Sequence, residues 1–331
     1  MKKIKIAQIG TSKNSHGYHI FNSITKQQDV FDVVGYALPE NEKEKFPEQV
    51  ETMSGYKEMT LEEVLNNPEI EAVTIETEEM YLTKYAIMAA EAGKHVHMEK
   101  PGGTELADFE KLVSILKSKG LTFSMGYMYR FNPKIIEAME RIKKGELGEI
   151  YSVEAHMDCK HPLNVREWLG NFPGGMLFFL GCHLIDLIYR IQGMPEEVIP
   201  LSCPTHLDGI ESKDYGMVVY KYKNGISFAK TCASEVGGFL RRQLVICGEK
   251  GTIELKPLEV LAEGGQYTVV NEAKSEDWHK PWDTETTPVY DRYDDMMKNF
   301  AEIIRGKENP YSYDYELELY KLILKSCGKE V

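Results

Sequence analysis

The sequence has few of the features that mark membrane, secreted or zinc-binding proteins. No apolar run reaches the ~18 residues of a membrane-spanning helix, and the apolar segment 4–9 is too short for the core of a secretory signal. The six cysteines are scattered and form no CxxC pair, which argues against a disulfide framework and against a structural zinc site. We therefore expect a cytoplasmic protein with reduced thiols.

Basic clusters are also lacking. The formal net charge is −13, with 39 Lys and Arg against 52 Asp and Glu, so the chain would repel a phosphate backbone or an anionic membrane. We expect no nucleic acid and no membrane as a partner. A small-molecule ligand is favoured instead.

Strand-like and helix-like segments alternate over the first 127 of the 331 residues. The alternation predicts an α/β fold with a parallel, doubly wound sheet, because strands separated by single helices pair in parallel. The alternation ends at about residue 127, and the pattern changes by the strand-like segment 150–158. The chain is therefore divided into domains 1–127 and 128–331. The predicted strands of the first domain are 3–9, 31–38, 70–75, 95–98 and 121–125, and its predicted helices are 18–27, 60–66, 80–92 and a segment that Thr104 would cap and Gly120 would end.

The loop after the first strand runs from Gly10 to Gly17. Glycines at this point let backbone N–H groups at a helix N-terminus approach a pyrophosphate. The two outer glycines are seven residues apart, Ser12 replaces a middle glycine, and a plain strand-to-helix turn explains the loop about as well. An acid that would bind an adenosine ribose is missing, since Leu38 holds that position and Glu40 is the nearest carboxylate.

A second signal stands at the end of the strand 95–98. Glu99, Lys100 and Pro101 follow it directly, and two glycines then let the chain turn away. The residue before a proline is restricted to extended conformations, so the Lys100 side chain should have a fixed direction. Ligands of open α/β sheets bind at the carboxyl ends of the strands, where both this segment and the glycine loop would lie.

Five motifs together make the chain resemble the Gfo/Idh/MocA oxidoreductases. They are the glycine loop, the run 92–96 followed by Glu99-Lys100-Pro101, and the segments 126–133, 181–186 and 248–252. The resemblance implies an N-terminal Rossmann domain and a C-terminal α/β domain with an open, mostly antiparallel sheet that often forms a homodimer or homotetramer contact. It also implies NAD or NADP as cofactor and a sugar, cyclitol or related polyol as substrate.

The same resemblance assigns residues. Lys100 and His183 would be catalytic, and both would contact the substrate together with Asn132. The cofactor would be bound by Gly10, Thr11, Ser12, His16, Gly17, Thr77, Glu99, Lys100, Pro101 and Arg130. Three positions depart from the family pattern: Phe179 replaces an aspartate four residues before the histidine, Thr77-Glu78-Glu79 and Leu82 replace a Thr-Pro-Asn and a histidine, and the ribose acid is absent.

The second domain is predicted to carry His183 on one long buried helix, 176–190. Phe179 and His183 would share a face of this helix, and a core histidine beside an Asp186–Arg190 pair is the alternative. Strands are expected at 150–158, 215–222, 227–234, 244–247 and 252–255, with a hairpin turn at Asn224-Gly225, and helices at 133–144, 290–305 and 313–326. The polar stretch 263–288 is expected to be a surface excursion, with a lid or a subunit contact as the alternatives.

His161, Arg166 and Trp168 are candidates for a sugar pocket, because ring hydroxyls need fixed donors and an apolar sugar face packs on aromatic rings. A metal site at His156, Asp158 and His161 lacks a recognisable ligand spacing, so no metal is expected.

These residues suggest a division of roles in hydride transfer. A lysine, with an ordinary pKa of ~10.4, suits polarisation of the reacting oxygen, whereas a histidine near ~6.5 suits proton exchange. Two rivals remain: a redox-neutral sugar hydrolase or lyase that recycles bound NAD, and a non-catalytic sensor of a dinucleotide or sugar.

Overall fold

The computed structural model describes residues 2–274 and 276–331, and these form two compact units. The first comprises the chain up to Met128 together with Tyr293–Tyr320, and the second comprises Tyr129–Arg292 and Lys321–Val331. The sequence division at 127/128 assigned Tyr293–Tyr320 to the second domain. In the structure this segment joins the first unit, where the α11 helix packs against α1.

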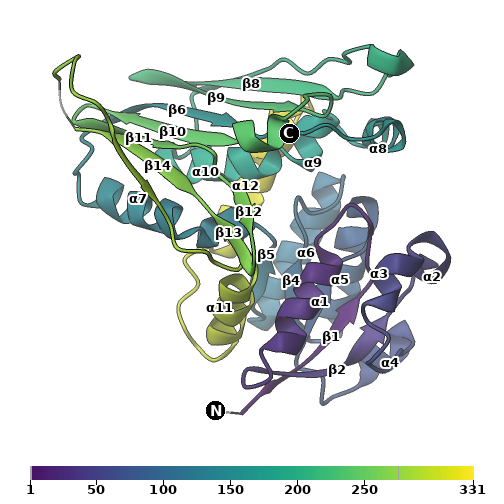
Figure 1. The fold of residues 1–331 in the computed structure, drawn as a ribbon. Coiled ribbons are helices and arrows are strands. Elements are labelled where there is room, and N and C mark those ends of the chain that lie inside the picture. Colours follow the sequence, from purple (N-terminus) through teal and green to yellow (C-terminus); the bar gives the residue numbers. More distant parts are fainter. Residues whose placement is uncertain (1, 275) are drawn as a thin grey trace. The chain divides into compact units, whose positions relative to one another are not determined.

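The first unit is built on a five-stranded sheet in the order β2-β1-β3-β4-β5, with every strand pairing in parallel (Figure 1). Its helices α1 and α5 pack on the strands, and α6 packs on α5. The strands are β1 (Ile4–Ile9), β2 (Phe31–Ala37), β3 (Ala72–Ile75), β4 (His95–Met98) and β5 (Phe123–Met125). The helices are α1 (Gly17–Lys26), α2 (Glu42–Lys45), α3 (Pro47–Glu51), α4 (Leu61–Asn66), η1 (Glu79–Tyr81), α5 (Leu82–Glu91), α6 (Leu106–Lys119), α11 (Asp294–Ile304) and the first part of α12 (Tyr313–Ser326).

The register places three strand ends side by side. Ile9 of β1 pairs with Ile75 of β3, which pairs with Met98 of β4. The ladder continues one residue further, because Glu76 N–H donates to the Ile9 carbonyl and Glu99 N–H donates to that of Ile75. The residues that follow β1, β3 and β4 therefore start from one edge of the sheet.

The second unit contains an eight-stranded sheet in the order β15-β14-β11-β10-β6-β9-β8-β7 (Figure 1). Only β6 and β9 pair in parallel among these described strands, so the predicted mostly antiparallel sheet is confirmed. Helix α10 packs on β6 and β9, and α9 packs on β8 and β9. The strands are β6 (Ile150–His156), β7 (Glu197–Pro200), β8 (Tyr215–Tyr222), β9 (Gly225–Cys232), β10 (Gln243–Gly248), β11 (Gly251–Leu255), β12 (Val260–Ala262), β13 (Gly265–Tyr267), β14 (Val269–Ala273) and β15 (Asp283–Thr286), and the helices are η2 (Met128–Phe131), α7 (Pro133–Lys143), α8 (Leu163–Trp168), η3 (Leu169–Asn171), α9 (Met176–Phe179), α10 (Cys182–Gln192), η4 (Leu207–Gly209) and η5 (Gly238–Arg241).

Three local predictions were wrong. The predicted long helix 176–190 is two helices, α9 and α10, separated at Leu180 and Gly181. The chain packs tightly there, since a Cβ on Gly181 would lie 2.5 Å from the Leu177 carbonyl oxygen. Helix α6 begins after Glu105 and not after Thr104. The polar stretch 263–288 contains β14 and β15, which extend the large sheet, and β13, which pairs with β12, although Ser275 within it lies outside the described residues.

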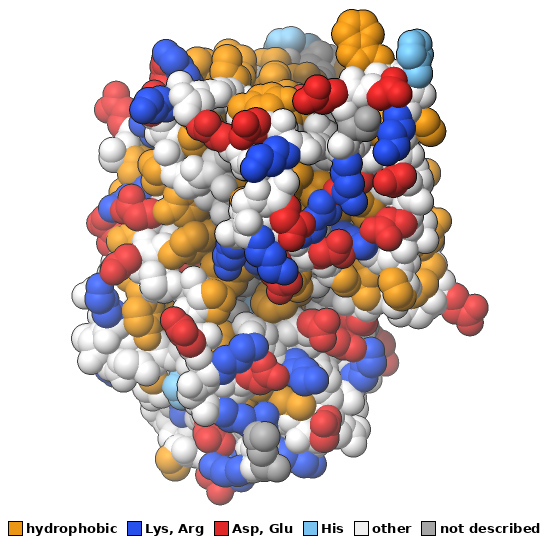
Figure 2. All heavy atoms as spheres, turned by 90° about the vertical axis from the view of Figure 1, so that its left-hand side faces the viewer, with side chains coloured by type: hydrophobic (Ala, Val, Ile, Leu, Met, Phe, Trp, Pro, Cys, Tyr) orange, Lys and Arg blue, Asp and Glu red, His pale blue; other side chains and the backbone are white. Residues whose placement is uncertain are grey.

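Charged groups of both signs are interspersed over the surface drawn in Figure 2. A groove of about 700 Å³ between α7 and the strands β14 and β15 is lined by such mixed charges, including Arg141, Glu272 and Lys274. No predicted site residue lines this groove. Within residues 2–274 and 276–331, no helix has the length and apolar character needed to cross a membrane.

Candidate active site

The β1–α1 loop of the first unit, called the glycine cradle below, turns sharply at its first residue and packs against the segment after β3. Gly10 has a φ of +81°, and a Cβ there would lie 2.3 Å from Cγ2 of Thr77. The side-chain amide of Gln8 donates to the carbonyls of Gly10 and Gly17, each at 3.1 Å, and so ties the two ends of the loop together. Helix α1 carries no acid in its first turn, which leaves its positive end available to a phosphate.

Other predicted cofactor residues line the same loop. Thr11 and Ser12 are buried, and the Thr11 hydroxyl has no hydrogen-bond partner within the structure. Buried polar atoms are nearly always hydrogen-bonded, so an unsatisfied hydroxyl beside the cradle fits a bound ligand. These residues fit the pyrophosphate of a dinucleotide.

The end of β2 lacks a free acid for the adenosine ribose. Glu40 accepts hydrogen bonds from Tyr85 and from Lys84, the latter at 2.9 Å. Burial would raise the pKa of Glu40, but the hydrogen bonds from Tyr85 and Lys84 outweigh it and hold the pKa below its usual value. The Glu40 carboxylate is thus already engaged within the protein.

Glu99 and Lys100 are buried where β4 ends. Lys100 is 1% exposed, and its Nζ lies 3.5 Å from Oε1 of Glu99. The same oxygen lies 3.1 Å from Nδ1 of His16, in the glycine loop. Burial would raise the pKa of Glu99, but His16 and Lys100 outweigh it and keep the pKa below its ordinary value. The structure thus brings three predicted residues, from two segments, into one contact.

Two further acids at this edge were not predicted as site residues. Glu76 directly follows β3, Glu79 begins η1, and both side chains are fully buried. Neither carboxyl group accepts or donates a hydrogen bond among the described residues. The sequence signal was available: two acids follow a buried apolar strand at the edge that carries the glycine loop.

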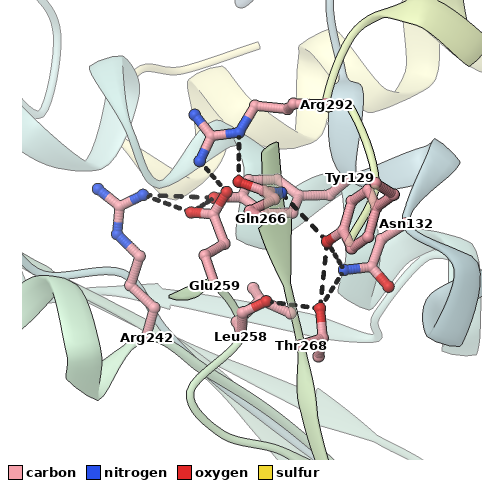
Figure 3. Close-up of polar contacts among 9 residues, drawn as sticks. Tyr129, Asn132, Arg242, Leu258, Glu259, Gln266, Thr268 and Arg292 are labelled. Atoms are coloured by element: carbon pink, nitrogen blue, oxygen red, sulfur yellow. Dashed lines mark hydrogen bonds and ion pairs between the residues drawn. The ribbon is translucent and has the colours of Figure 1, made fainter. Parts of the chain in front are cut away.

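In the second unit, His183 lies near the start of α10 and contacts Tyr129 edge-on, with ring centroids 5.1 Å apart. Tyr129 donates a hydrogen bond of 2.5 Å to Glu259, whose carboxylate also binds Arg242 and Arg292 (Figure 3). The network fixes Tyr129, and through it one side of the His183 ring. Sequence reasoning missed Glu259 and Arg242, because no motif marks them.

Phe179 lies in an aromatic group with two predicted substrate residues. Its ring is 5.2 Å from the Trp168 ring and 6.2 Å from the His161 ring. The Trp168 Nε1–H and the His161 Nε2 are buried and make no hydrogen bond among the described residues. Burial, aided by Arg242, lowers the pKa of His161 to about 4, so its imidazole is neutral at neutral pH. Aromatic rings can pack against the apolar face of a hydroxylated ring, and ring nitrogens without hydrogen bonds can bind its hydroxyl groups.

The remaining predicted residues are engaged in holding the second unit together. Arg130 binds Asp186 of α10 through Nε and Nη2, which anchors the helix that carries His183. Asn132 caps α7 through its side-chain oxygen, and its amide donates to Thr268 and Tyr290, as Figure 3 shows in part.

Arg166 is likewise engaged. It binds Asp208 and Ser234 and lies 3.7 Å from Asp214. Whether it also contacts a substrate stays a prediction.

No group of three or more His, Cys, Asp or Glu side chains in residues 2–274 and 276–331 could hold a metal ion. Asp158, from the metal alternative, accepts a hydrogen bond of 3.0 Å from Lys230.

Comparison with known proteins adds independent information. Residues 4–127 match a family model described as an oxidoreductase family with an NAD-binding Rossmann fold, and residues 135–254 match a model of the GFO/IDH/MocA C-terminal domain. The two models together cover most of the chain.

Curated relatives include uncharacterized oxidoreductase YhhX of Escherichia coli, 34% identical over 59% of this chain and 55% of that protein. Bovine trans-1,2-dihydrobenzene-1,2-diol dehydrogenase is 26% identical over 61% of each chain. The NADP(+)-dependent scyllo-inositol 2-dehydrogenase IolW of Bacillus subtilis is 27% identical over 49% of this chain and 46% of that protein. The match therefore spans less than two thirds of the length of each of these relatives.

Solved structures confirm the fold. A putative NADPH-dependent oxidoreductase from Desulfitobacterium hafniense superposes with a TM-score of 0.82 at 19% identity, covering 99% of this chain and 95% of that one. KijD10, a 3-ketoreductase from Actinomadura kijaniata solved with NADP and TDP-benzene, superposes with a TM-score of 0.80 at 16% identity, covering 97% and 96%.

Proposed function

Because the chain belongs to the Gfo/Idh/MocA oxidoreductases with an NAD-binding Rossmann fold, we propose that it transfers hydride between NAD or NADP and a polyol. The reacting group would be a secondary hydroxyl or ketone of a sugar, cyclitol or related compound. The observation that carries the proposal is the buried Lys100 at the edge of the sheet that also holds the glycine cradle. Its ammonium lies 3.5 Å from the Glu99 carboxylate, at the carboxyl end of β4 where ligands of open α/β sheets bind.

Lys100 is proposed to polarise the reacting oxygen. Its side chain acts on the carboxyl groups of Glu76, Glu79 and Glu99, and it lowers the pKa of each of them. A charged Lys100 can donate a hydrogen bond to an alkoxide or ketone oxygen but cannot accept the hydroxyl proton. The bound nicotinamide supplies the hydride acceptor or donor.

His183 is proposed to exchange the proton. Histidine has an ordinary pKa near ~6.5 and changes charge close to neutral pH. Tyr129, fixed by Glu259, contacts the His183 ring and would hold its orientation during the transfer. Arg130, bound to Asp186, would position the helix from which His183 projects.

A polyol is supported as substrate by the aromatic group around Phe179. Trp168 and His161 present buried, unsatisfied ring nitrogens beside the Phe179 ring. Relatives named for scyllo-inositol and for a dihydrobenzenediol act on ring carbons that bear hydroxyls, which agrees with such a wall. Homo-oligomer formation through the large sheet stays a proposal, supported by the partly buried Val219 and Phe228, which pair on β8 and β9.

The test is a turnover assay with inositols, glucose and a cyclic dihydrodiol, each with NAD⁺ and with NADP⁺. We expect at least one polyol to reduce one dinucleotide, seen as the near-ultraviolet absorbance of the reduced nicotinamide. Dinucleotide retained after purification, with chemical change of a sugar but no net reduction, would identify the redox-neutral reaction instead. Failure of every substrate with a protein that still binds dinucleotide would point to a sensor.

A further inference from the structure

Two buried carboxyl groups of the first unit are left without hydrogen bonds by the fold. Glu76 and Glu79 each have a relative exposure of 0%, and none of their four carboxyl oxygens has a hydrogen-bond partner in the described residues. Nε2 of His97 lies 3.9 Å from Oε1 of Glu76, which is too long for a hydrogen bond. Unsatisfied buried acids cost stability, so their retention needs an explanation.

The position of Glu76 and Glu79 in the fold offers an explanation for their retention. In a doubly wound sheet the pyrophosphate lies over the β1–α1 loop and the adenosine ribose lies at the end of β2. Since β2 and β3 flank β1 on opposite sides, the other half of a dinucleotide lies toward the ends of β3 and β4. Glu76 follows β3 and Glu79 lies three residues further on, so both are on the nicotinamide side.

The charges around Glu79 leave it able to ionise near neutral pH. The charged groups that face it are Lys100 and Glu99 from the segment after β4, and Glu76 and Glu78 from its own segment. Glu99 is in turn paired with His16, Glu76 lies near His97, and Glu78 is paired with Lys45. Burial raises the pKa of Glu79 to about 7, against the lowering effect of Lys100. Burial and Glu99 raise the pKa of Glu76 well above its usual value, whereas burial lowers that of His97 to about 4.

We propose that the carboxyl groups of Glu76 and Glu79 accept hydrogen bonds from the nicotinamide ribose hydroxyls, and that the charge of Glu79 selects oxidised over reduced cofactor. The oxidised nicotinamide ring is a cation and the reduced ring is neutral, while the riboses are the same. An ionised carboxylate in a buried site therefore attracts only the oxidised form. The inference rests on the proposed function and deepens it, because it makes oxidation of an alcohol the favoured direction.

The preference for the oxidised cofactor implies that binding releases a proton. At a pH below about 7 the Glu79 carboxyl group is mostly protonated, and binding of NAD⁺ would favour loss of this proton to solvent. The affinity for NAD⁺ should therefore rise with pH through this range. NADH gives no such drive, and its affinity should change little. Each unit of coupled pKa shift corresponds to about a tenfold change in affinity.

The experiment compares the wild-type chain, Glu79→Gln and the neighbouring control Glu78→Gln. Dissociation constants are measured at pH 6 and pH 8, for NAD⁺ by calorimetry and for NADH by its fluorescence. In the wild type we expect NAD⁺ to bind about tenfold more tightly at pH 8 than at pH 6, the effect of one unit of coupling. Glu79→Gln should lose this dependence and bind NAD⁺ about tenfold more weakly at pH 8, with NADH affinity within about twofold of the wild type. Glu78→Gln should keep the pH dependence of the wild type, because Glu78 pairs with Lys45 and acts on the pKa of Glu79 less than burial, Lys100 or Glu99 does.

An unchanged ratio of NAD⁺ to NADH affinity in Glu79→Gln would overturn the inference and leave the proposed function intact. If the wild type binds neither form, nor the NADP⁺ and NADPH pair, the proposed function itself fails. Should Glu79→Gln not fold, Glu79→Asp decides the question: it keeps the charge on a shorter side chain, so a retained pH dependence with weaker binding of both forms supports the proposal. Loss of NADH binding alone in Glu79→Asp would contradict it.

Discussion

Replacing Lys100 with methionine is expected to lower kcat by at least about 10²-fold, while the dinucleotide still binds. The substitution removes the only lysine among the described residues whose ammonium lies within 4 Å of Glu99, but it leaves the glycine cradle and the hydrophobic length of the side chain. Losses of about 10²–10⁴ are typical when a group that donates to the reacting oxygen is removed. Turnover is measured with the polyol found in the substrate assay, and binding with NADH fluorescence.

Lys94→Met is the matched control. Lys94 is also buried and stands just before the same strand, β4, but at its opposite end, where its ammonium donates to the carbonyls of Asn67 and Ile70. We expect Lys94→Met to lower the melting temperature and to leave kcat within about threefold of the wild type, because it touches no reacting group. Undiminished turnover in Lys100→Met with bound cofactor would remove Lys100 from the chemistry.

Glu259→Gln is expected to cost the second unit about 3–5 kcal/mol of unfolding free energy, the usual cost of leaving buried charges unpaired. Arg242 and Arg292 share this one fully buried carboxylate, which also accepts the Tyr129 hydroxyl. The measurement is urea unfolding followed by tryptophan fluorescence, and it reports on this unit because Trp168, Trp278 and Trp282 all belong to it. Glu285→Gln, which removes an exposed carboxylate paired with Lys134, should cost no more than about 1 kcal/mol.

The difference in unfolding free energy between the wild type and Glu259→Gln is expected to become smaller at acid pH. Burial would raise the pKa of Glu259, but Arg292, Arg242 and the Tyr129 hydrogen bond outweigh it and place the pKa below the ordinary 4.5. The stabilisation is therefore fully present above pH 4.5 and is lost as the pH falls through the lowered pKa of the folded state. The gap between wild type and Glu259→Gln should narrow in acid. A constant gap would contradict the ionised state of Glu259.

Local patterns carried most of the fold prediction for the first unit. The Thr60 side chain accepts from Glu63 N–H and the Glu63 carboxylate accepts from Thr60 N–H, as the capping box predicted. Gly120 ends α6 with a φ of +62°, again as predicted. One error occurred at Leu180 and Gly181, where the apolar pattern of 176–190 continues but the helix is interrupted.

The polar stretch 263–288 was harder to predict for a different reason. Its strands β14 and β15 lie at one edge of the large sheet, where polar side chains face solvent and the period-2 pattern is weak. Pairing of β14 with β11, and not local composition, makes it a strand.

The candidate site also contains residues that the sequence predicts and residues that it does not. Glu99, Lys100 and the glycine loop could be placed from strand ends alone, because parallel strands end at one edge of a sheet. Glu76 and Glu79 also follow a strand end, but an acid in sequence is by default exposed, so their burial could not be predicted, and no motif marks Glu259 at all. The partners of Glu259 are Tyr129, Arg242 and Arg292, which lie elsewhere in the chain.

The most direct test of the nicotinamide-dependent function is a titration of the protein with NADH and NADPH, followed by the fluorescence of the reduced ring. It should include Gly10→Ala, in which a Cβ would meet Thr77, and Gly120→Ala, which has the same positive sign of φ but open space around it. Saturable binding of one dinucleotide by the wild type and Gly120→Ala, with loss of at least about tenfold in affinity in Gly10→Ala, is the expected result. Absence of binding in the wild type, or equal binding in Gly10→Ala, would contradict a dinucleotide site at the β1–α1 loop.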